Sequence, residues 1–202
     1  ESFLRKRSIL SKIFTFFVVF FIYISSAYAA CDFIIDIGDK KTKFVERFTE
    51  PFPQFEGLFM LPVPSPEICP NDNLDQDIAV EYIFLGENLA SIRMLVFNDE
   101  NNSISNNLLL MNYAKKNFGD FDTGENPLIY NNFQSWEIGG KIIVYKRLAD
   151  PEGFIEEEIY ISNDEYDYKL GKFYNEMIET GKEPTKMTIA KLLYNYGCLY
   201  KT

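Results

Sequence analysis

The segment that decides the fold is 133-FQSWEIGGKIIVYKRL-148. Two runs suited to β-strands, Phe133 to Ile138 and Lys141 to Leu148, flank the pair Gly139-Gly140. Glycine tolerates the positive φ angles that a two-residue hairpin turn requires, so the segment predicts an antiparallel hairpin. Residues 155–162 alternate between apolar and polar side chains and predict a third strand that continues the meander.

A second hairpin is predicted over residues 78–97. Its first strand, residues 78–85, is apolar on both faces, and residues 89–97 return after the turn Gly86-Glu87-Asn88. Strands that are apolar on both faces are typical of a central position, or of a sheet that is covered on both sides. Before this hairpin, the proline-rich segment Pro51 to Asp77 predicts an extended surface connection, with an edge strand at Leu58 to Leu61.

Apolar residues at helical spacing predict four helices. The first covers residues 40–48 and ends before Pro51, and the second begins after an N-cap at Ser103 or Ser105 and ends at Gly119. The third follows the capping-box spacing of Ser162 to Glu165 and ends at Gly181, and the fourth runs from Ile189 to Gly197.

These elements predict an α+β fold, with an antiparallel meander sheet and helices packed mainly on one face. A helix followed by a meander occurs twice along the chain. This repetition indicates an alternative division of the domain into two tandem helix-hairpin units, residues 31–102 and 103–202.

The first thirty residues have the three parts of a secretory signal peptide. A basic start (Arg5, Lys6, Arg7 and Lys12) precedes the apolar run 13–24, and the small-residue segment 25–29 ends in Ala-Tyr-Ala. The apolar run is shorter than the roughly twenty residues of a spanning helix, which favours removal over anchoring. We therefore predict a signal peptide over residues 1–30, one exported domain over 31–202, and a periplasmic or secreted location.

Three cysteines, Cys31, Cys69 and Cys198, allow one disulfide and one remaining thiol. We expect Cys31 to pair with Cys69 or with Cys198, and the spacing does not choose between them. The alternative is a lipoprotein in which Cys31 carries the lipid and Cys69 pairs with Cys198. Tyr28 stands where a lipoprotein signal has leucine, so simple secretion is the preferred interpretation. Membrane contact is then limited to the signal segment, or to the lipid on Cys31 in the alternative.

The chain is acidic, with 20 basic and 30 acidic residues and a net charge of −10. Removal of residues 1–30 leaves 16 basic and 29 acidic side chains, a net charge of −13. Phosphate backbones are repelled by such a surface, and no extended Lys/Arg cluster offsets it, so nucleic acid is excluded as a partner.

The sequence lacks the residues that several kinds of catalysis require. The chain contains no histidine, which excludes histidine-activated nucleophiles, histidine-bearing zinc sites and imidazole acid–base steps. Neither glycine-rich phosphate-binding signature is present, and no C-x-x-C motif occurs. We therefore predict a protein that is not an enzyme and has no cofactor, no metal and no catalytic residue.

Acidic clusters provide the other candidate chemistry. Two carboxylates suffice for a histidine-free glycosidase mechanism, and the candidates are Asp120, Asp122 and Glu125, or Glu156, Glu157 and Glu158. Strand alternation places Glu157 on one face and turns Glu156 and Glu158 to the other, where a solvated sheet face accounts for them without catalysis.

Two segments, 71–77 and 120–124, vaguely resemble the start of a calcium loop. Gln76 stands where the first of these loops requires glycine, so polar turns are the preferred interpretation of both. Trp136 is predicted to pack in the core or at its margin, with contact to a ligand as the alternative.

The order of elements around Ile37, Gly38 and Pro51 resembles the SmpA/OmlA and β-lactamase-inhibitor-protein type of envelope domain. In that order a short helix and a proline stop precede a meander. The resemblance implies a small exported helix-plus-sheet module that acts in assembly or inhibition by binding proteins. The function predicted is a non-catalytic module that binds another envelope protein, and the alternative is a binder of a lipid or another small apolar ligand.

Overall fold

A computed structural model describes residues 31–72, 74, 78–98, 108–121, 132–149 and 155–180. The chain divides into two units, Glu1–Ala30 and Cys31–Thr202, and the first lies outside the described residues. The predicted signal peptide and the predicted helix 189–197 therefore belong to parts of the chain that are not described. No helix of the described ranges is long and apolar enough to cross a membrane.

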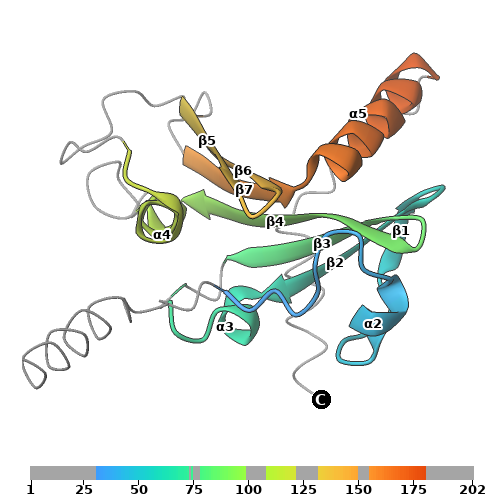
Figure 1. The fold of residues 1–202 in the computed structure, drawn as a ribbon, viewed down its shortest axis with the longest axis horizontal. Coiled ribbons are helices and arrows are strands. Elements are labelled where there is room, and N and C mark those ends of the chain that lie inside the picture. Colours follow the sequence, from blue (N-terminus) through green and yellow to red (C-terminus); the bar gives the residue numbers. More distant parts are fainter. Residues whose placement is uncertain are drawn as a thin grey trace, which may run out of the picture. The chain divides into compact units, whose positions relative to one another are not determined.

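Seven strands form one antiparallel sheet in the order β1-β2-β3-β4-β7-β6-β5 (Figure 1). The described helices are α2 (Lys41–Val45), α3 (Ser65–Ile68), α4 (Leu109–Phe118) and α5 (Asp164–Glu179). This architecture confirms the predicted α+β class with an antiparallel sheet. The strands are β1 (Phe52–Phe55), β2 (Leu58–Pro64), β3 (Ala79–Leu85), β4 (Asn88–Asn98), β5 (Asn132–Ile138), β6 (Lys141–Ala149) and β7 (Ile155–Ser162).

Both predicted hairpins are confirmed. β3 pairs with β4, and β5 pairs with β6 across Gly139-Gly140, whose φ angles are +59° and +75°. Positive φ at both central residues is the requirement of the hairpin turn that matches strand twist, and glycine meets it without a steric cost. β7 has the predicted bounds and pairs with β6.

The prediction for residues 51–77 was wrong in its main point. Residues 58–64 form β2, an interior strand that pairs with β1 on one side and β3 on the other, rather than an edge strand in a surface loop. β1 pairs with β2 only as far as Met60, so the later residues of β2 have one neighbour. Pro62 and Pro64 lie in that part of β2, where a missing N–H on the outer side removes no ladder hydrogen bond.

The centre of the sheet is the pair β4–β7. Ile92 lies opposite Ile161 and Met94 opposite Ile159, so the last strand of each meander pairs with the last strand of the other. The two outer strands of the described sheet are consequently β1 and β5.

Helices α2, α3 and α4 contribute to the main core. Phe44 of α2 is fully buried, and its ring centroid lies 4.5 Å from that of Tyr82 and 5.4 Å from that of Phe84. Ile68 of α3 and Leu110 of α4 belong to the same cluster of buried side chains. Burying such large apolar side chains is the main favourable term in folding.

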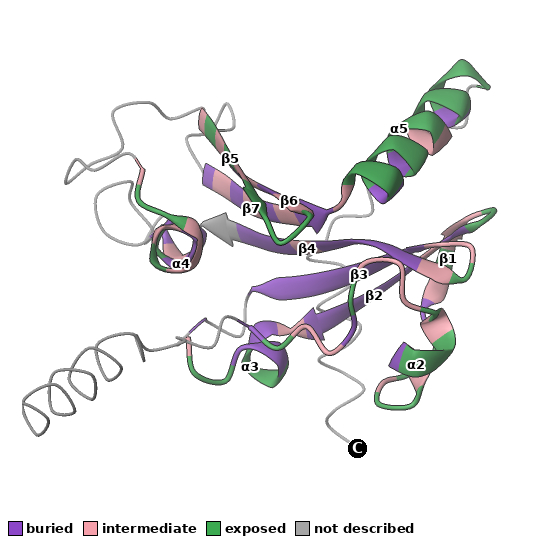
Figure 2. Cartoon of the chain, in the orientation of Figure 1, coloured by how far each residue is buried: buried purple, intermediate pink, exposed green. Residues whose placement is uncertain are grey.

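Helix α5 contributes to a second cluster of buried side chains, which lies on the opposite face of the sheet. Tyr166 and Leu170 pack with Leu58, Met60 and Ile83. This arrangement leaves β3 buried on both faces, as its sequence predicts (Figure 2).

The N-caps of α4 and α5 differ from the predicted ones. The cap of α5 is Asn163, whose side-chain oxygen accepts from the Tyr166 N–H at 2.9 Å. Ser162 still belongs to β7 and donates to the Ala90 carbonyl at 2.7 Å. Helix α4 begins at Leu109 with Leu108 as its N-cap. The predicted caps, Ser103 and Ser105, lie outside the described residues.

Cys31 and Cys69 form a disulfide, with their Cα atoms 4.3 Å apart. The predicted pairing of Cys31 is thereby resolved in favour of Cys69. Around this bond the Asp32 N–H donates to the Ile68 carbonyl at 3.0 Å, and the Cys31 N–H donates to the Tyr113 hydroxyl at 3.2 Å. The start of the described chain is thus fixed to α3 and α4.

Candidate functional site

Strands β6 and β7 have one buried face and one accessible face. Along β7 buried and half-buried residues alternate, and the same alternation runs through the middle of β6 (Figure 2). β5 adds exposed residues in the matching positions. We call the accessible side the open face; its residues are Phe133, Ser135, Glu137, Ile142, Val144, Lys146, Leu148, Glu156, Glu158 and Tyr160.

The open face is accessible because α5 covers a different part of the same side of the sheet. The buried residues of α5 pack on Leu58 and Met60 of β2, Ile83 of β3 and Ala90 of β4. Among the described elements, no helix shares a core cluster with the open face.

Two apolar side chains dominate the exposed area of this face. Phe133 is 71% exposed and Leu148 is 43% exposed. Ile142 and Val144, on the same face of β6, are half-buried. Large apolar side chains gathered on one sheet face, rather than scattered singly, are typical of a surface that meets another molecule.

Polar groups of the open face are organised into pairs. Lys146 Nζ lies 2.9 Å from a carboxylate oxygen of Glu158, directly across the β6–β7 ladder. The Tyr160 hydroxyl donates to Asp167 of α5 at 2.9 Å. The Lys146–Glu158 row lies between the row of Val144 and the row of Leu148, so the open face mixes apolar side chains with a paired charge, as protein interfaces do.

The predicted alternation of the three glutamates is confirmed. Glu157 is fully buried, whereas Glu156 and Glu158 point to the open face and are half-buried. The three carboxylates therefore do not share a cleft. Asp120 is exposed, and Asp122 and Glu125 lie outside the described residues.

Sequence reasoning missed a buried polar cluster under α4. Glu157 accepts from the Tyr145 hydroxyl at 2.9 Å and from the Met111 N–H at 2.9 Å. Arg147 lies directly opposite Glu157 on β6 and is also fully buried. Burial, together with the carboxylate of Glu157, raises the pKa of the Tyr145 hydroxyl.

This cluster has a structural task. The Leu108 N-cap makes no side-chain hydrogen bond to the first turn of α4, so the carboxylate of Glu157 takes over part of that capping. A negative charge at a helix N-terminus also interacts favourably with the helix dipole. The inward position of Arg147 on β6, two residues after Tyr145, was the available sequence signal.

A second ion pair lies between β3 and β4, where Glu81 is fully buried and Arg93 is partly exposed. Glu81 accepts from Nε and Nη2 of Arg93 through one oxygen, Oε2, at 2.7 and 2.6 Å. Its other oxygen and the nearby Ser91 hydroxyl are buried without a hydrogen-bond partner among the described residues. Burial raises the pKa of the Glu81 carboxyl, and the charge of Arg93 partly opposes this shift.

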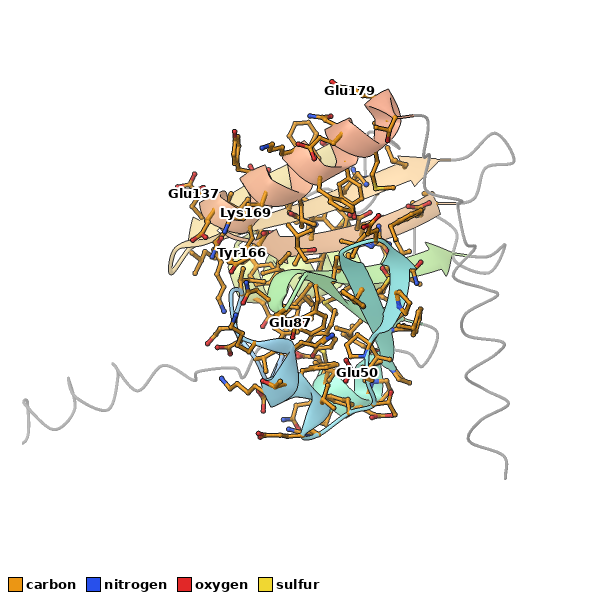
Figure 3. The ribbon with its side chains drawn as sticks, turned by 90° about the vertical axis from the view of Figure 1, so that its right-hand side faces the viewer. Glu50, Glu87, Glu137, Tyr166, Lys169 and Glu179 are labelled. Carbon is orange, nitrogen blue, oxygen red and sulfur yellow. A yellow bond between two sulfur atoms is a disulfide. The ribbon has the colours of Figure 1, made fainter. Side chains whose placement is uncertain are left out.

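An open hollow of about 400 Å³ lies beside α2, in the region of Glu50 and Glu87 (Figure 3). Lys41 is engaged in interactions within the protein. Its Nζ lies 3.0 Å from Glu50, 3.6 Å from Glu87 and 4.3 Å from the ring centre of Phe59. The hydrogen bond to Glu50 is the main cause of its raised pKa. The hollow is open rather than enclosed, which does not suit a small apolar ligand. Its lining comprises Lys41, Thr42, Val45, Glu46, Glu50 and Glu87.

Neither of the two segments that resemble a calcium loop brings a set of ligands together among the described residues. Asp72 is engaged with Lys116 at 2.8 Å, and much of both segments lies outside the described residues. Across the described part of the chain, no three His, Cys, Asp or Glu side chains gather as a metal site would require.

Trp136 packs as predicted. Its ring lies 5.7 Å from Phe118 and 5.4 Å from Phe121, centroid to centroid, and contacts the main core.

Comparison of this chain with protein-family models, with curated proteins and with solved structures finds no match. The resemblance to envelope domains of the SmpA/OmlA and β-lactamase-inhibitor-protein type stays a prediction from element order.

Proposed function

We propose that this protein is an exported, non-catalytic module that binds another envelope protein through its open face. The observation that carries the proposal is the exposure of Phe133 and Leu148 on one face of the sheet, outside the part that α5 covers. Leaving such side chains in water costs free energy that a bound protein surface recovers.

Export is supported by the cysteines as well as by the leader. Structural disulfides such as Cys31–Cys69 are typical of oxidising compartments, which is where a signal peptide delivers a protein. The sulfur of Cys31 cannot be bonded to Cys69 and to a lipid at once. We therefore place the protein in the periplasm or outside the cell rather than on a lipid anchor.

The proposed origin of the sheet is a duplication. The order β2-β3-β4-β7-β6-β5 relates one three-strand meander to the other by an approximate two-fold axis between β4 and β7. A helix precedes each meander, α2 in the first and α4 in the second. This order of elements supports the proposed tandem helix-hairpin arrangement, in which α2, α3 and α4 contribute to the main core and α5 contributes to the second cluster.

The alternative function, binding of a lipid or another small apolar ligand, has no comparable support among the described residues. Such a ligand requires an enclosed apolar pocket. The hollow beside α2 is open rather than enclosed.

A photo-crosslinking experiment tests the proposal. A photoreactive amino acid replaces Phe133 in the full-length protein in its source cells, and the matched control carries it at Tyr168 of α5. These two side chains are 71% and 73% exposed, so they differ in location rather than in accessibility.

We expect one discrete adduct with a different protein from position 133 and none from position 168. The substitution Leu148→Asp in the same chain abolishes this adduct, because it replaces one of the two exposed apolar side chains of the open face with a charge. Equal adducts from both positions, or an adduct unaffected by Leu148→Asp, would show that the open face is not the binding site.

A further inference from the structure

Among the described residues, the two outer strands of the sheet differ in length and regularity. β1 has four residues, contains Pro53 and changes register between Pro53 and Phe55. Proline, short length and irregular register are the features that prevent further strand pairing. β5 has seven residues in continuous register with β6 and contains neither proline nor lysine.

Local hydrogen bonds reveal which backbone groups of β5 point outward. The Phe133 N–H donates to the side-chain oxygen of Asn132 at 2.8 Å. The side-chain amide of Gln134 donates to the Ser135 carbonyl at 3.2 Å. Backbone groups in an antiparallel strand alternate between its two neighbours, so Phe133, Ser135 and Glu137 direct their N–H and C=O groups away from β6.

We propose that β5 pairs with β5 of a second copy of this chain, antiparallel and about a two-fold axis at Ser135. The three outward-facing residues are symmetric about Ser135, so Phe133 of one copy faces Glu137 of the other. This register supplies about six backbone hydrogen bonds. In a single copy, the side chains of Asn132 and Gln134 make hydrogen bonds to outward-facing backbone groups of β5. When the second copy docks, its backbone replaces these side chains.

Side chains in this register favour a second copy over an unrelated strand. Ser135, a small residue, meets itself at the axis, where a large side chain would be crowded. Lys146 lies beside Phe133 in the same cross-strand row. Glu137 of the second copy enters that row from the other side, so opposite charges flank the aromatic ring. Pairing also joins the two open faces into one continuous surface.

Both copies are acidic, and this opposes association. The net charge after residue 30 is −13 for each chain. Salt screens repulsion between such surfaces, so the dimer is expected to strengthen as ionic strength rises.

Sedimentation of the purified protein without residues 1–30 tests the proposal. We expect a concentration-dependent dimer, and we expect Ser135→Lys to raise its dissociation constant by about fivefold or more, because it places like charges directly opposite each other. Asn175→Lys adds the same charge on the exposed side of α5 and leaves the dimer unchanged. A chain that stays monomeric at high concentration and high salt, or a dimer insensitive to Ser135→Lys, overturns the proposal.

Cysteine crosslinking in a Cys198→Ser background tests the register. Paired residues at the axis have Cα atoms about 5.5 Å apart, within the range of a disulfide, so Ser135→Cys is expected to give a covalent dimer on oxidation. Glu137→Cys is the control, because two such residues lie more than about 13 Å apart along the paired strands. A dimer crosslinked equally by both variants, or by the control alone, refutes this register. Neither experiment involves the envelope partner, so the dimer and the proposed function fail independently.

Discussion

Replacement of Glu157 tests the account of the buried cluster under α4. Its carboxylate is fully buried, accepts from Tyr145 and Met111, and lies opposite the buried Arg147. Removing one member of a buried charged pair costs about 3–5 kcal/mol, because the other charge is left uncompensated. We expect Glu157→Ala to lower the free energy of unfolding by that amount. Glu157→Gln keeps an acceptor for the two hydrogen bonds but also leaves the charge of Arg147 uncompensated, so we expect the free energy of unfolding to fall by about 3 kcal/mol, at the lower end of that range.

Urea unfolding followed by the fluorescence of Trp136 measures these losses. Trp136 is the one tryptophan of the chain and packs against Phe118 and Phe121 beside the main core, so its emission reports on this region. The matched control is Glu156→Ala, one residue away on the open face, for which we expect a change within about 0.5 kcal/mol. Faster hydrogen exchange of the Met111 amide should accompany Glu157→Ala. Equal losses for the two alanine variants, or a loss below about 1 kcal/mol for Glu157→Ala, would refute the reasoning.

Two further predictions concern the disulfide and the pH dependence of stability. Reduction, or Cys69→Ser, opens a loop whose ends are 38 residues apart, and chain entropy sets the cost at about 4 kcal/mol in the free energy of unfolding; an unchanged thermal midpoint with and without reductant would contradict this. The pKa of Glu81 is raised above its ordinary value of 4.5, so the folded state binds more protons than the unfolded state above that pH. The Glu81 contribution to stability is then full below pH 4.5 and is lost as pH rises through the raised pKa. In urea titrations above pH 4.5 the wild-type protein should therefore show a declining component that Glu81→Gln lacks; parallel curves for the two proteins would exclude it.

Local patterns carried most of the secondary structure that could be predicted. The Gly139-Gly140 turn and the alternation of residues 155–162 depend on neighbours in sequence, and both were predicted correctly. The interior position of β2 was not, because Pro62 and Pro64 are compatible with a strand only where β1 has ended, and that boundary depends on pairing between distant segments.

The candidate site was predictable in part. Alternation along β7 is a local pattern, and it is enough to separate Glu157 from Glu156 and Glu158. The open face itself was not predictable, because it depends on where α5 packs, and α5 covers β2, β3 and β4 rather than the neighbouring strands. Pairing of Cys31 with Cys69 likewise depends on α3, a short helix with no clear periodic signal.

The central pair β4–β7 has a consequence for the order in which this chain folds. Ile92 and Ile161 face each other across the sheet although they lie about seventy positions apart in sequence. Contacts between residues so far apart in sequence form late and slowly, because closing the large loop between them costs chain entropy. The hairpins on either side can form early, but the sheet is completed only when the chain is available as far as β7. Late completion of the sheet suits the export proposed above, because a chain must be unfolded to pass across a membrane.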